Sequence, residues 1–206
     1  QAVPLYISAI AVAIGFKMNL FNIGVEGQYR VAMLTTVAVG TSVDLPAPLH
    51  VLLCLAVAMV TGAAWAAIPA LLKVHRGVSE VISTIMMNYI ATGVLAFLFS
   101  EVFAQREVGD LNPKSKILPT SAWMPNIIEE GLHNLTGFIV VAALLGVAYY
   151  LLVWKSRFGF QLRASGANPT AAKTAGINPR SMILRAMLLS GAVAGLVGMP
   201  QLLGDK

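Results

Sequence analysis

Residues 154–185, WKSRFGFQLRASGANPTAAKTAGINPRSMILR, decide the fold, because they form a polar stretch between two long apolar runs. From residue 155 onward every charged side chain in this stretch is a cation, and the set comprises Lys155, Arg157, Arg163, Lys173, Arg180 and Arg185. Cations gathered at the ends of hydrophobic segments mark the cytoplasmic side of a membrane. The stretch therefore predicts a cytoplasmic loop of a membrane protein.

A short helix is predicted inside this loop. Asn168 suits an N-cap, Pro169 suits the first helical position, and Gly176 can close the helix in the left-handed conformation. Asn178 and Pro179 then stop any continuation. A helix this short and rich in alanine is marginal alone, and its smooth face suits docking into a groove of another protein. The alternative is an ordinary capped loop helix, and spacing alone favours neither.

The composition identifies the class of protein. Of the 206 residues, 57% are hydrophobic and only 11% are charged, whereas a soluble domain usually has about 25% charged residues. The chain is therefore an integral membrane protein. Its net charge of +5 indicates topology rather than nucleic-acid binding, because the cations flank apolar runs. Cys54 is the single cysteine, and the sequence predicts neither an internal disulfide nor a metal site.

The runs without charged residues predict the helices, and they cover 1–16, 31–43, 45–72, 81–100, 131–154 and 186–204. A helix that crosses about 30 Å of hydrocarbon needs roughly 20 residues, so the last four runs are long enough and the first two are short. We expect an all-α fold, a polytopic transmembrane helical bundle forming a single domain over residues 1–206. Gly62 with its neighbouring alanines, and the pair Gly191 and Gly195, predict close helix packing.

A broken-helix region is predicted between the two short runs, at residues 17–28. Short hydrophobic segments interrupted by glycine and polar residues are typical of broken helices that line a path through a membrane protein. The segment FNIGVEGQ at 21–28 supplies three candidate path residues, Asn22, Glu26 and Gln28. A plain cytoplasmic turn is the alternative, and the flanking cations Lys17 and Arg30 favour it.

A polar stripe is predicted on the helix that starts near residue 80. Ser79 suits its N-cap, and residues 80, 84 and 88 are spaced to share one helix face. Polar groups at membrane depth face protein or an aqueous path, so the candidates here are Glu80, Ser83, Thr84 and Asn88. Alternatively, Glu80 is an interfacial cap near Arg76 and Asn88 joins two helices.

Residues 105–136 form a second polar stretch, with three cations and four acids. The contrast with residues 155–185 places 105–136 outside the cell and 155–185 inside. We expect a short interfacial helix within residues 122–131.

Four segments in order resemble the permeases of ABC importers of the branched-chain amino acid, ribose and nucleoside group, most closely the nucleoside or simple-sugar branch. They are FNIGVEGQ (21–28), GVSEVISTIMMNYIA (77–91), RFGFQLRASGANPTAAKTAGIN (157–178) and SGAVAGLVGMPQLLG (190–204). The resemblance implies that the loop helix is a coupling helix, with contacts to an ATPase from Gly166, Asn168, Pro169, Ala171, Ala172 and Gly176. Family members usually continue with several more helices, so we expect the chain to be a fragment of a longer permease.

The resemblance also implies partners and a location. We expect cytoplasmic ABC ATPase subunits that carry ATP and Mg²⁺, a second permease subunit, an extracytoplasmic substrate-binding lipoprotein and the lipid bilayer, in the cell inner (plasma) membrane. The chain lacks a phosphate-binding loop, so we expect a multi-pass transport subunit that binds no cofactor and is not an enzyme. The alternatives are an ion-gradient-driven secondary transporter, an ABC importer of sugars or branched-chain amino acids, and a structural subunit of a membrane complex.

Overall fold

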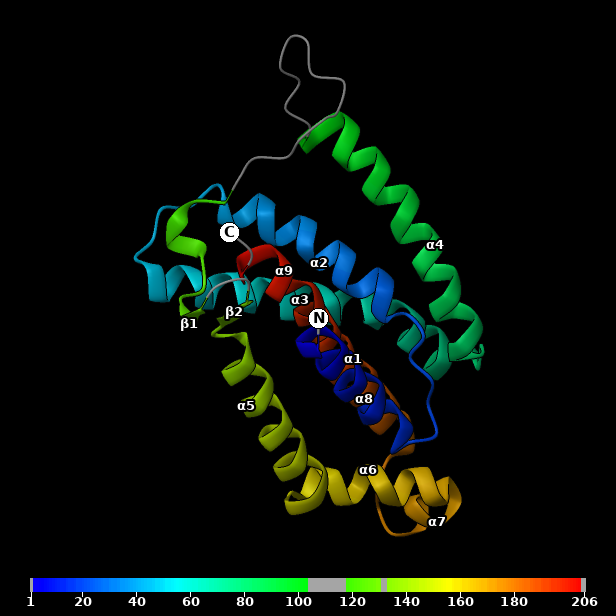
Figure 1. The fold of residues 1–206 in the computed structure, drawn as a ribbon. Coiled ribbons are helices and arrows are strands. Elements are labelled where there is room, and N and C mark those ends of the chain that lie inside the picture. Colours follow the sequence, from blue (N-terminus) through cyan, green and yellow to red (C-terminus); the bar gives the residue numbers. More distant parts are fainter. Residues whose placement is uncertain (1, 104–117, 131–132, 205–206) are drawn as a thin grey trace.

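The computed structural model describes residues 2–103, 118–130 and 133–204 (Figure 1). The helices in chain order are α1 (Ala2–Phe16), α2 (Val25–Gly40), α3 (Ala47–Arg76), α4 (Glu80–Leu98), α5 (Phe138–Tyr150), α6 (Arg157–Ala167), α7 (Pro169–Thr174), α8 (Pro179–Gly195) and α9 (Met199–Gly204). Short turns extend or join them, namely η1 (Phe99–Phe103), η2 (Thr120–Ala122), η3 (Leu151–Lys155) and η4 (Leu196–Gly198). The strands β1 (Asn126–Glu130) and β2 (His133–Thr136) pair as one antiparallel hairpin.

Four helical segments are long and apolar enough to cross a membrane, as the charge-free runs predict. They are Ala47–Arg76, Glu80–Val102, Phe138–Lys155 and Pro179–Gly204. The two short runs become the shorter helices α1 and α2, of 15 and 16 residues. The predicted polytopic helical bundle is therefore confirmed.

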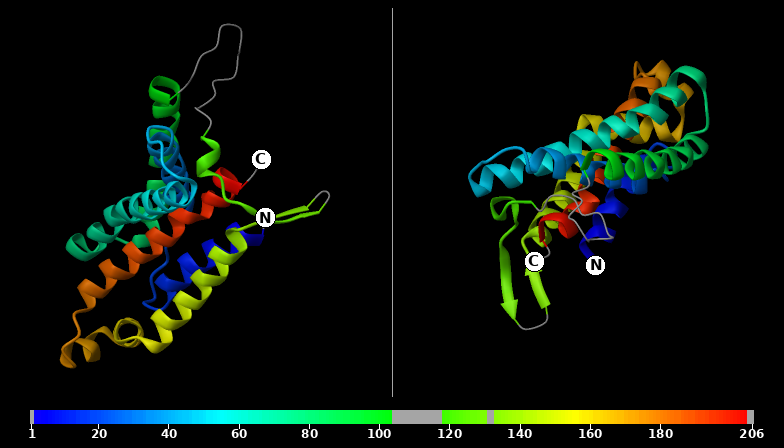
Figure 2. Two further views of the ribbon diagram at one scale, coloured as in Figure 1. Left: turned by 90° about the vertical axis from the view of Figure 1, so that its left-hand side faces the viewer. Right: turned by 90° about the horizontal axis from the view of Figure 1, so that it is seen from above.

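The last of these segments is the centre of the bundle. In Pro179–Gly204, 67% of the most apolar 18 residues are buried inside the protein, against 17–22% of the corresponding residues in the other three segments. Two further views show α8 between α3 on one side and α1 and α5 on the other (Figure 2). The exposed apolar faces of α4 and α5 suit contact with lipid or with further helices.

Small residues bring α3 and α8 together. A Cβ atom at Gly62 would collide with the carbonyl oxygen of Gly191, and one at Gly195 would collide with the carbonyl oxygen of Ala58. The predicted small-residue faces therefore pack against each other. In lipid no hydrophobic effect drives helices together, so this close van der Waals packing holds α3 against α8.

The hairpin stands where the sequence predicts a helix, so that prediction is wrong. Residues 126–130 form a strand, although we expect a short interfacial helix within 122–131 from the sequence. The β-branched residues Ile127 and Ile128 favour an extended backbone, and the partner strand directly follows in the chain. The backbone N–H of Met124 donates to the carbonyl oxygen of Leu203 over 2.8 Å, which attaches the segment before the hairpin to α9. Residues 105–117 of the predicted outer loop lie outside the described residues.

Candidate functional site

The helix break predicted from the sequence separates α1 from α2. After Phe16 the chain turns, with the backbone N–H groups of Met18 and Leu20 donating to the carbonyl oxygen of Gly15 over 2.8 and 3.1 Å. Asn19 takes a positive φ of 54°, a conformation that asparagine tolerates better than most residues. We name residues 17–24 the broken segment. Regular helix resumes at Val25.

A buried polar network holds the broken segment in place. The side-chain amide of Asn22 donates to Gln28 Oε1 over 3.0 Å and to Ser190 Oγ on α8 over 2.8 Å. Asn22 Oδ1 accepts from Gln28 Nε2 over 3.0 Å and from the backbone N–H of Gly24 over 3.1 Å. Ser190 Oγ in turn donates to the carbonyl oxygen of Ala11 over 2.6 Å. Asn22, Gln28 and Ser190 are each at most 1% exposed, so this network is a structural element in which Asn22 has no free hydrogen-bonding capacity.

Asn88 connects the two polar segments that the sequence predicts to line a path, residues 21–28 and the first turns of α4. Its Nδ2 donates to the carbonyl oxygen of Ile23 over 3.0 Å, and its Oδ1 accepts from the backbone N–H of Gly27 over 2.9 Å. A Cβ atom at Gly27 would lie 2.8 Å from Asn88 Oδ1, so the glycine allows α2 and α4 to approach. This contact fits the interpretation of Asn88 as a residue that joins two helices.

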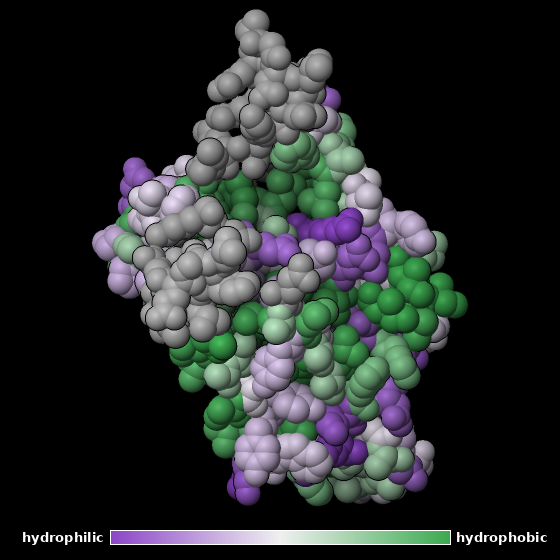
Figure 3. Space-filling view, in the orientation of Figure 1, coloured by the Kyte–Doolittle hydropathy of each residue, from purple (hydrophilic) through white to green (hydrophobic). Residues whose placement is uncertain are grey.

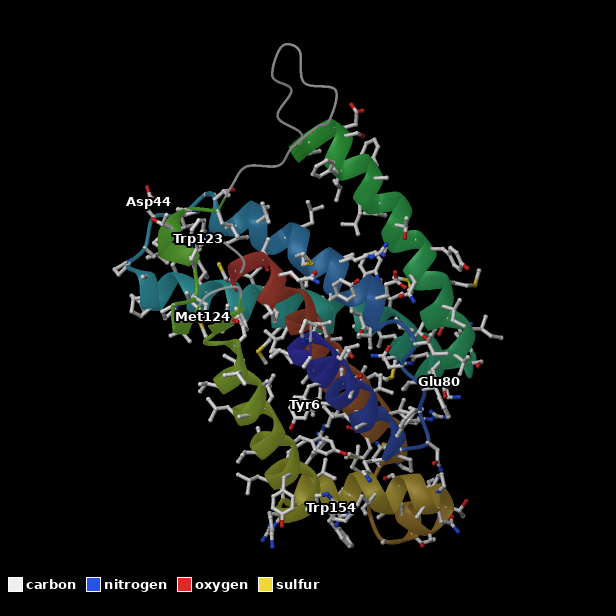
Figure 4. All side chains as sticks on the ribbon, in the orientation of Figure 1. Tyr6, Asp44, Glu80, Trp123, Met124 and Trp154 are labelled. Atoms are coloured by element: carbon white, nitrogen blue, oxygen red, sulfur yellow. The ribbon has the colours of Figure 1, made fainter. Side chains whose placement is uncertain are left out.

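The other candidates on α4 make local contacts. Ser83 Oγ donates to the carbonyl oxygen of Ser79 over 3.0 Å, and Thr84 Oγ1 donates to that of Glu80 over 2.6 Å. Both hydroxyls are buried and bonded within their own helix. Glu80, at the start of α4 (Figure 4), pairs with Lys73 over 2.7 Å rather than with Arg76. Its carboxylate therefore joins the end of α3 to the start of α4.

A groove of about 610 Å³ borders the broken segment. It runs between α1, residues 21–29 and the start of α9, and its lining includes Ser8, Phe16, Phe21, Asn22, Glu26, Tyr29 and Gln201. The rings of Phe16 and Phe21 stand edge to face, with centroids 4.8 Å apart. The sequence did not indicate Ser8, Tyr29 and Gln201, because only the packing of α1 against the α8–α9 segment places these three residues beside residues 21–28.

Glu26 is the one predicted path residue whose side chain is mostly exposed. It pairs with Arg30 over 2.6 Å, one helical turn along α2, and remains 54% exposed. It lines the groove and also a smaller one of about 240 Å³ that contains Asn88. An exposed pair of this kind stabilises the fold little, so its carboxylate is available for a ligand.

The loop helix α7 has the predicted caps. Asn168 Oδ1 accepts from the backbone N–H groups of Thr170 and Ala171, each over 3.0 Å, and Gly176 has a φ of 79°. Pro169 is the first helical residue. The space-filling view shows hydrophilic residues at the lower end of the molecule, where Figure 1 places α6 and α7 (Figure 3).

Two of the six predicted coupling residues face the protein itself. Ala172 is 3% exposed, because α7 packs this alanine against the rest of the loop; the exposed positions of the helix include Pro169, Ala171 and Lys173. The carbonyl oxygen of Gly166 accepts from Asn19 Nδ2 over 2.9 Å, and a Cβ atom at Gly166 would lie 2.9 Å from the Cα atom of Met18. Ala172 and Gly166 therefore take part in packing within the chain, and the contact of the six residues with an ATPase stays a prediction.

The contact between Asn19 and Gly166 joins α6 to the broken segment. It is reinforced by a core cluster in which Leu162 of α6 packs with Met18 and Leu20. The segment that borders the groove is thus packed directly against α6.

Comparison with known proteins identifies the family of the chain. Residues 1–204 match the family described as branched-chain amino acid transport system / permease component. A guanosine ABC transporter permease protein of Bacillus subtilis is 40% identical over 206 residues, covering 99% of this chain and 58% of the relative. A nucleoside ABC transporter permease protein of Lactococcus lactis is 32% identical over 202 residues (95% and 55%), and a glucose ABC transporter permease protein of Haloferax volcanii is 31% identical over 217 residues (100% and 56%).

No solved structure matches the chain. The chain spans little more than half the length of these curated relatives. The family match and the four apolar segments identify a multi-pass membrane protein, and the family's description is that of a permease component of a transport system. The chain belongs to the permease-component family of branched-chain amino acid transport systems.

Proposed function

We propose that the chain is the path-forming and coupling part of a permease subunit in an ATP-driven importer of nucleosides. The names of two relatives refer to guanosine and to nucleosides. The glucose permease of Haloferax volcanii supports a simple sugar as the second candidate substrate. In this proposal ATP and Mg²⁺ are bound by cytoplasmic ATPase subunits. A second permease subunit completes the membrane part, and an extracytoplasmic binding lipoprotein delivers the substrate.

The observation that carries the proposal is the hydrogen bond of 2.9 Å between Asn19 and Gly166. It connects the loop with the exposed, capped helix α7 to the broken segment beside the groove. A partner that moves α7 when it hydrolyses ATP would therefore move the wall of the groove. A groove of about 800 Å³ between α7 and the start of α8 offers the partner a surface at the same loop.

The groove beside the broken segment has the chemistry that a nucleoside requires. A polar solute that leaves water needs replacement hydrogen bonds, and the groove offers neutral donors and acceptors on Ser8, Tyr29 and Gln201. The rings of Phe16 and Phe21 suit stacking with a base, an interaction that stabilises by about 1–3 kcal/mol per base. The carboxylate of Glu26 suits a ribose hydroxyl.

The alternative of a secondary transporter finds less support. Coupling to an ion gradient uses acids within the membrane that bind the ion. The two acids nearest the broken segment are both paired, Glu26 with Arg30 and Glu80 with Lys73. In each pair a cation already balances the charge of the carboxylate.

Uptake by the complete permease tests the substrate and the energy source. Proteoliposomes that contain it with its ATPase and binding protein are given radiolabelled guanosine, ribose or leucine, with ATP or with an imposed ion gradient. We expect guanosine uptake that requires ATP. Uptake of leucine but not guanosine would overturn the nucleoside assignment, and uptake driven by the gradient without ATP would overturn the ABC assignment.

A matched pair of variants tests docking at α7. Ala171→Glu places a charge on the exposed face of the helix, whereas Ala172→Glu buries one within the loop. We expect Ala171→Glu to leave the permease stable but to abolish binding of the ATPase, because an unpaired charge in a contact is strongly unfavourable. Ala172→Glu should instead destabilise the permease itself. Normal binding of the ATPase by Ala171→Glu rejects the docking role.

A further inference from the structure

Another groove lies at the junction of α5 and α6, and no residue of the broken segment lines it. It has a volume of about 570 Å³, and its lining includes Trp154, Lys155, Arg157, Phe160 and Arg163. Trp154 lies at the lower end of the molecule, where α5 meets α6 (Figure 4). Neither the transport path nor the face of α7 uses these residues.

The groove is cationic. Its three charged residues are Lys155, Arg157 and Arg163, and no acid lines it. Lys155 and Arg157 are exposed, and neither forms an ion pair within the part of the chain that the structure describes. Two adjacent cations without a counter-ion attract an anionic group and leave their hydrogen-bond donors free for it.

The groove also contains aromatic side chains, and two cations lie over the ring of its tryptophan. The guanidinium of Arg163 lies 4.6 Å from the centroid of the Trp154 ring, and Lys17 Nζ lies 5.2 Å from it. Arg163 also donates to the carbonyl oxygen of Val153. The side chains of Trp154 and Phe160 are nevertheless 51% and 62% exposed. Rings placed like this at the end of a membrane helix suit the boundary between headgroups and acyl chains.

An apolar surface leads into the groove from the membrane. The segment Phe138–Lys155 is 18 residues long and apolar, and it ends at the cations. Leu144, Val147 and Leu151 on it are more than half exposed. A ligand that uses the whole surface must carry a negative charge at one end and hydrocarbon chains at the other.

We propose that this groove binds the phosphate headgroup of an anionic phospholipid, with its acyl chains along the exposed face of α5. Basic pockets at the cytoplasmic ends of transmembrane helices have the chemistry for such headgroups. An acidic surface of a partner protein would meet the cations but would leave the exposed side chains of α5 unused. The site is independent of the proposed substrate. Because α6 carries the contact with Asn19, a bound headgroup would also steady the loop.

Photo-crosslinking in nanodiscs tests the site on the complete permease. Photoactivatable phosphatidylglycerol should label the peptide containing residues 151–163, whereas photoactivatable phosphatidylcholine should label it much less. Neutralising both exposed cations with Lys155→Gln and Arg157→Gln should lower the labelling by about fivefold for each cation. The charge-preserving pair Lys155→Arg and Arg157→Lys should restore it, which separates loss of charge from loss of fold. Arg180→Gln, an exposed cation of the same loop outside this groove, should have no effect.

Several results would overturn the proposal. Equal labelling by the two lipids would mean that the groove does not select an anionic headgroup. A loss of labelling in Arg180→Gln equal to that in the Lys155→Gln, Arg157→Gln variant would mean that the cations of the groove have no special role. Full competition by inorganic phosphate would assign the site to a free anion. Labelling that disappears when the ATPase subunits are added would assign the groove to the partner protein.

Discussion

The polar residues around the broken segment fall into two groups, and they differ in burial. Asn22, Gln28 and Ser190 are buried and bonded to one another, so they hold α1, α2 and α8 together. Glu26 and Gln201 line the groove and are exposed. A polar residue at membrane depth can stabilise the fold or contact the substrate. Which of the two it does depends on whether its hydrogen-bonding groups are already paired within the protein. We therefore expect variants of the first group to lower stability and variants of the second to lower uptake.

The largest effect is expected from Asn22→Leu. The change leaves the amide of Gln28 unpaired and removes a donor from Ser190, in a buried site. Each buried polar group left unpaired costs about 1–3 kcal/mol. The melting temperature of the purified permease should fall clearly, measured beside Glu26→Gln as the exposed control. A melting temperature equal to that of the control would show that the network does not support the fold.

A smaller effect is expected from Asn88→Leu. It removes the two hydrogen bonds that join α4 to Ile23 of the broken segment and to Gly27 of α2. Each has a net contribution of about 1 kcal/mol. Nucleoside uptake should weaken while binding of the ATPase is retained, because the α6–α7 loop is not touched. Thr92→Val is the matched control on the same helix, since its hydroxyl bonds only to the carbonyl oxygen of Asn88. Uptake that falls equally in both variants would remove any special role of Asn88.

The smallest effect on stability is expected from Glu26→Gln. Its ion pair with Arg30 is exposed and contributes about 0–1 kcal/mol, so the melting temperature should barely change. If the carboxylate bonds a ribose hydroxyl, the guanosine concentration at half-maximal uptake should rise. An unchanged concentration dependence would leave Glu26 with no role beyond pairing Arg30.

Local features of the structure were predictable from the sequence, and contacts between distant segments were not. The spans, the break after Phe16 and the caps of α7 follow from charge-free runs and from residues that act on their own neighbours. The pairing of Asn22 with Ser190 crosses 168 residues, and that of Asn19 with Gly166 crosses 147. No pattern within either segment indicates such a partner.

The same distinction between local features and distant contacts applies to α7. Ala171 and Ala172 are neighbours of the same residue type, and only the packing shows that Ala172 faces inward while Ala171 faces out. Ser190 is a small polar residue in an apolar run, a signal that indicates a buried partner without naming it.

We propose that the contact between Asn19 and Gly166 transmits movement of the loop to the groove. Asn19→Gly tests it, because glycine tolerates the positive φ and lacks the side-chain amide that donates the hydrogen bond. The measurement is the number of guanosine molecules imported per ATP hydrolysed by the complete importer in proteoliposomes. We predict that hydrolysis stays close to that of the unmodified importer while import falls, so that the ratio drops several-fold. An unchanged ratio would contradict the claim.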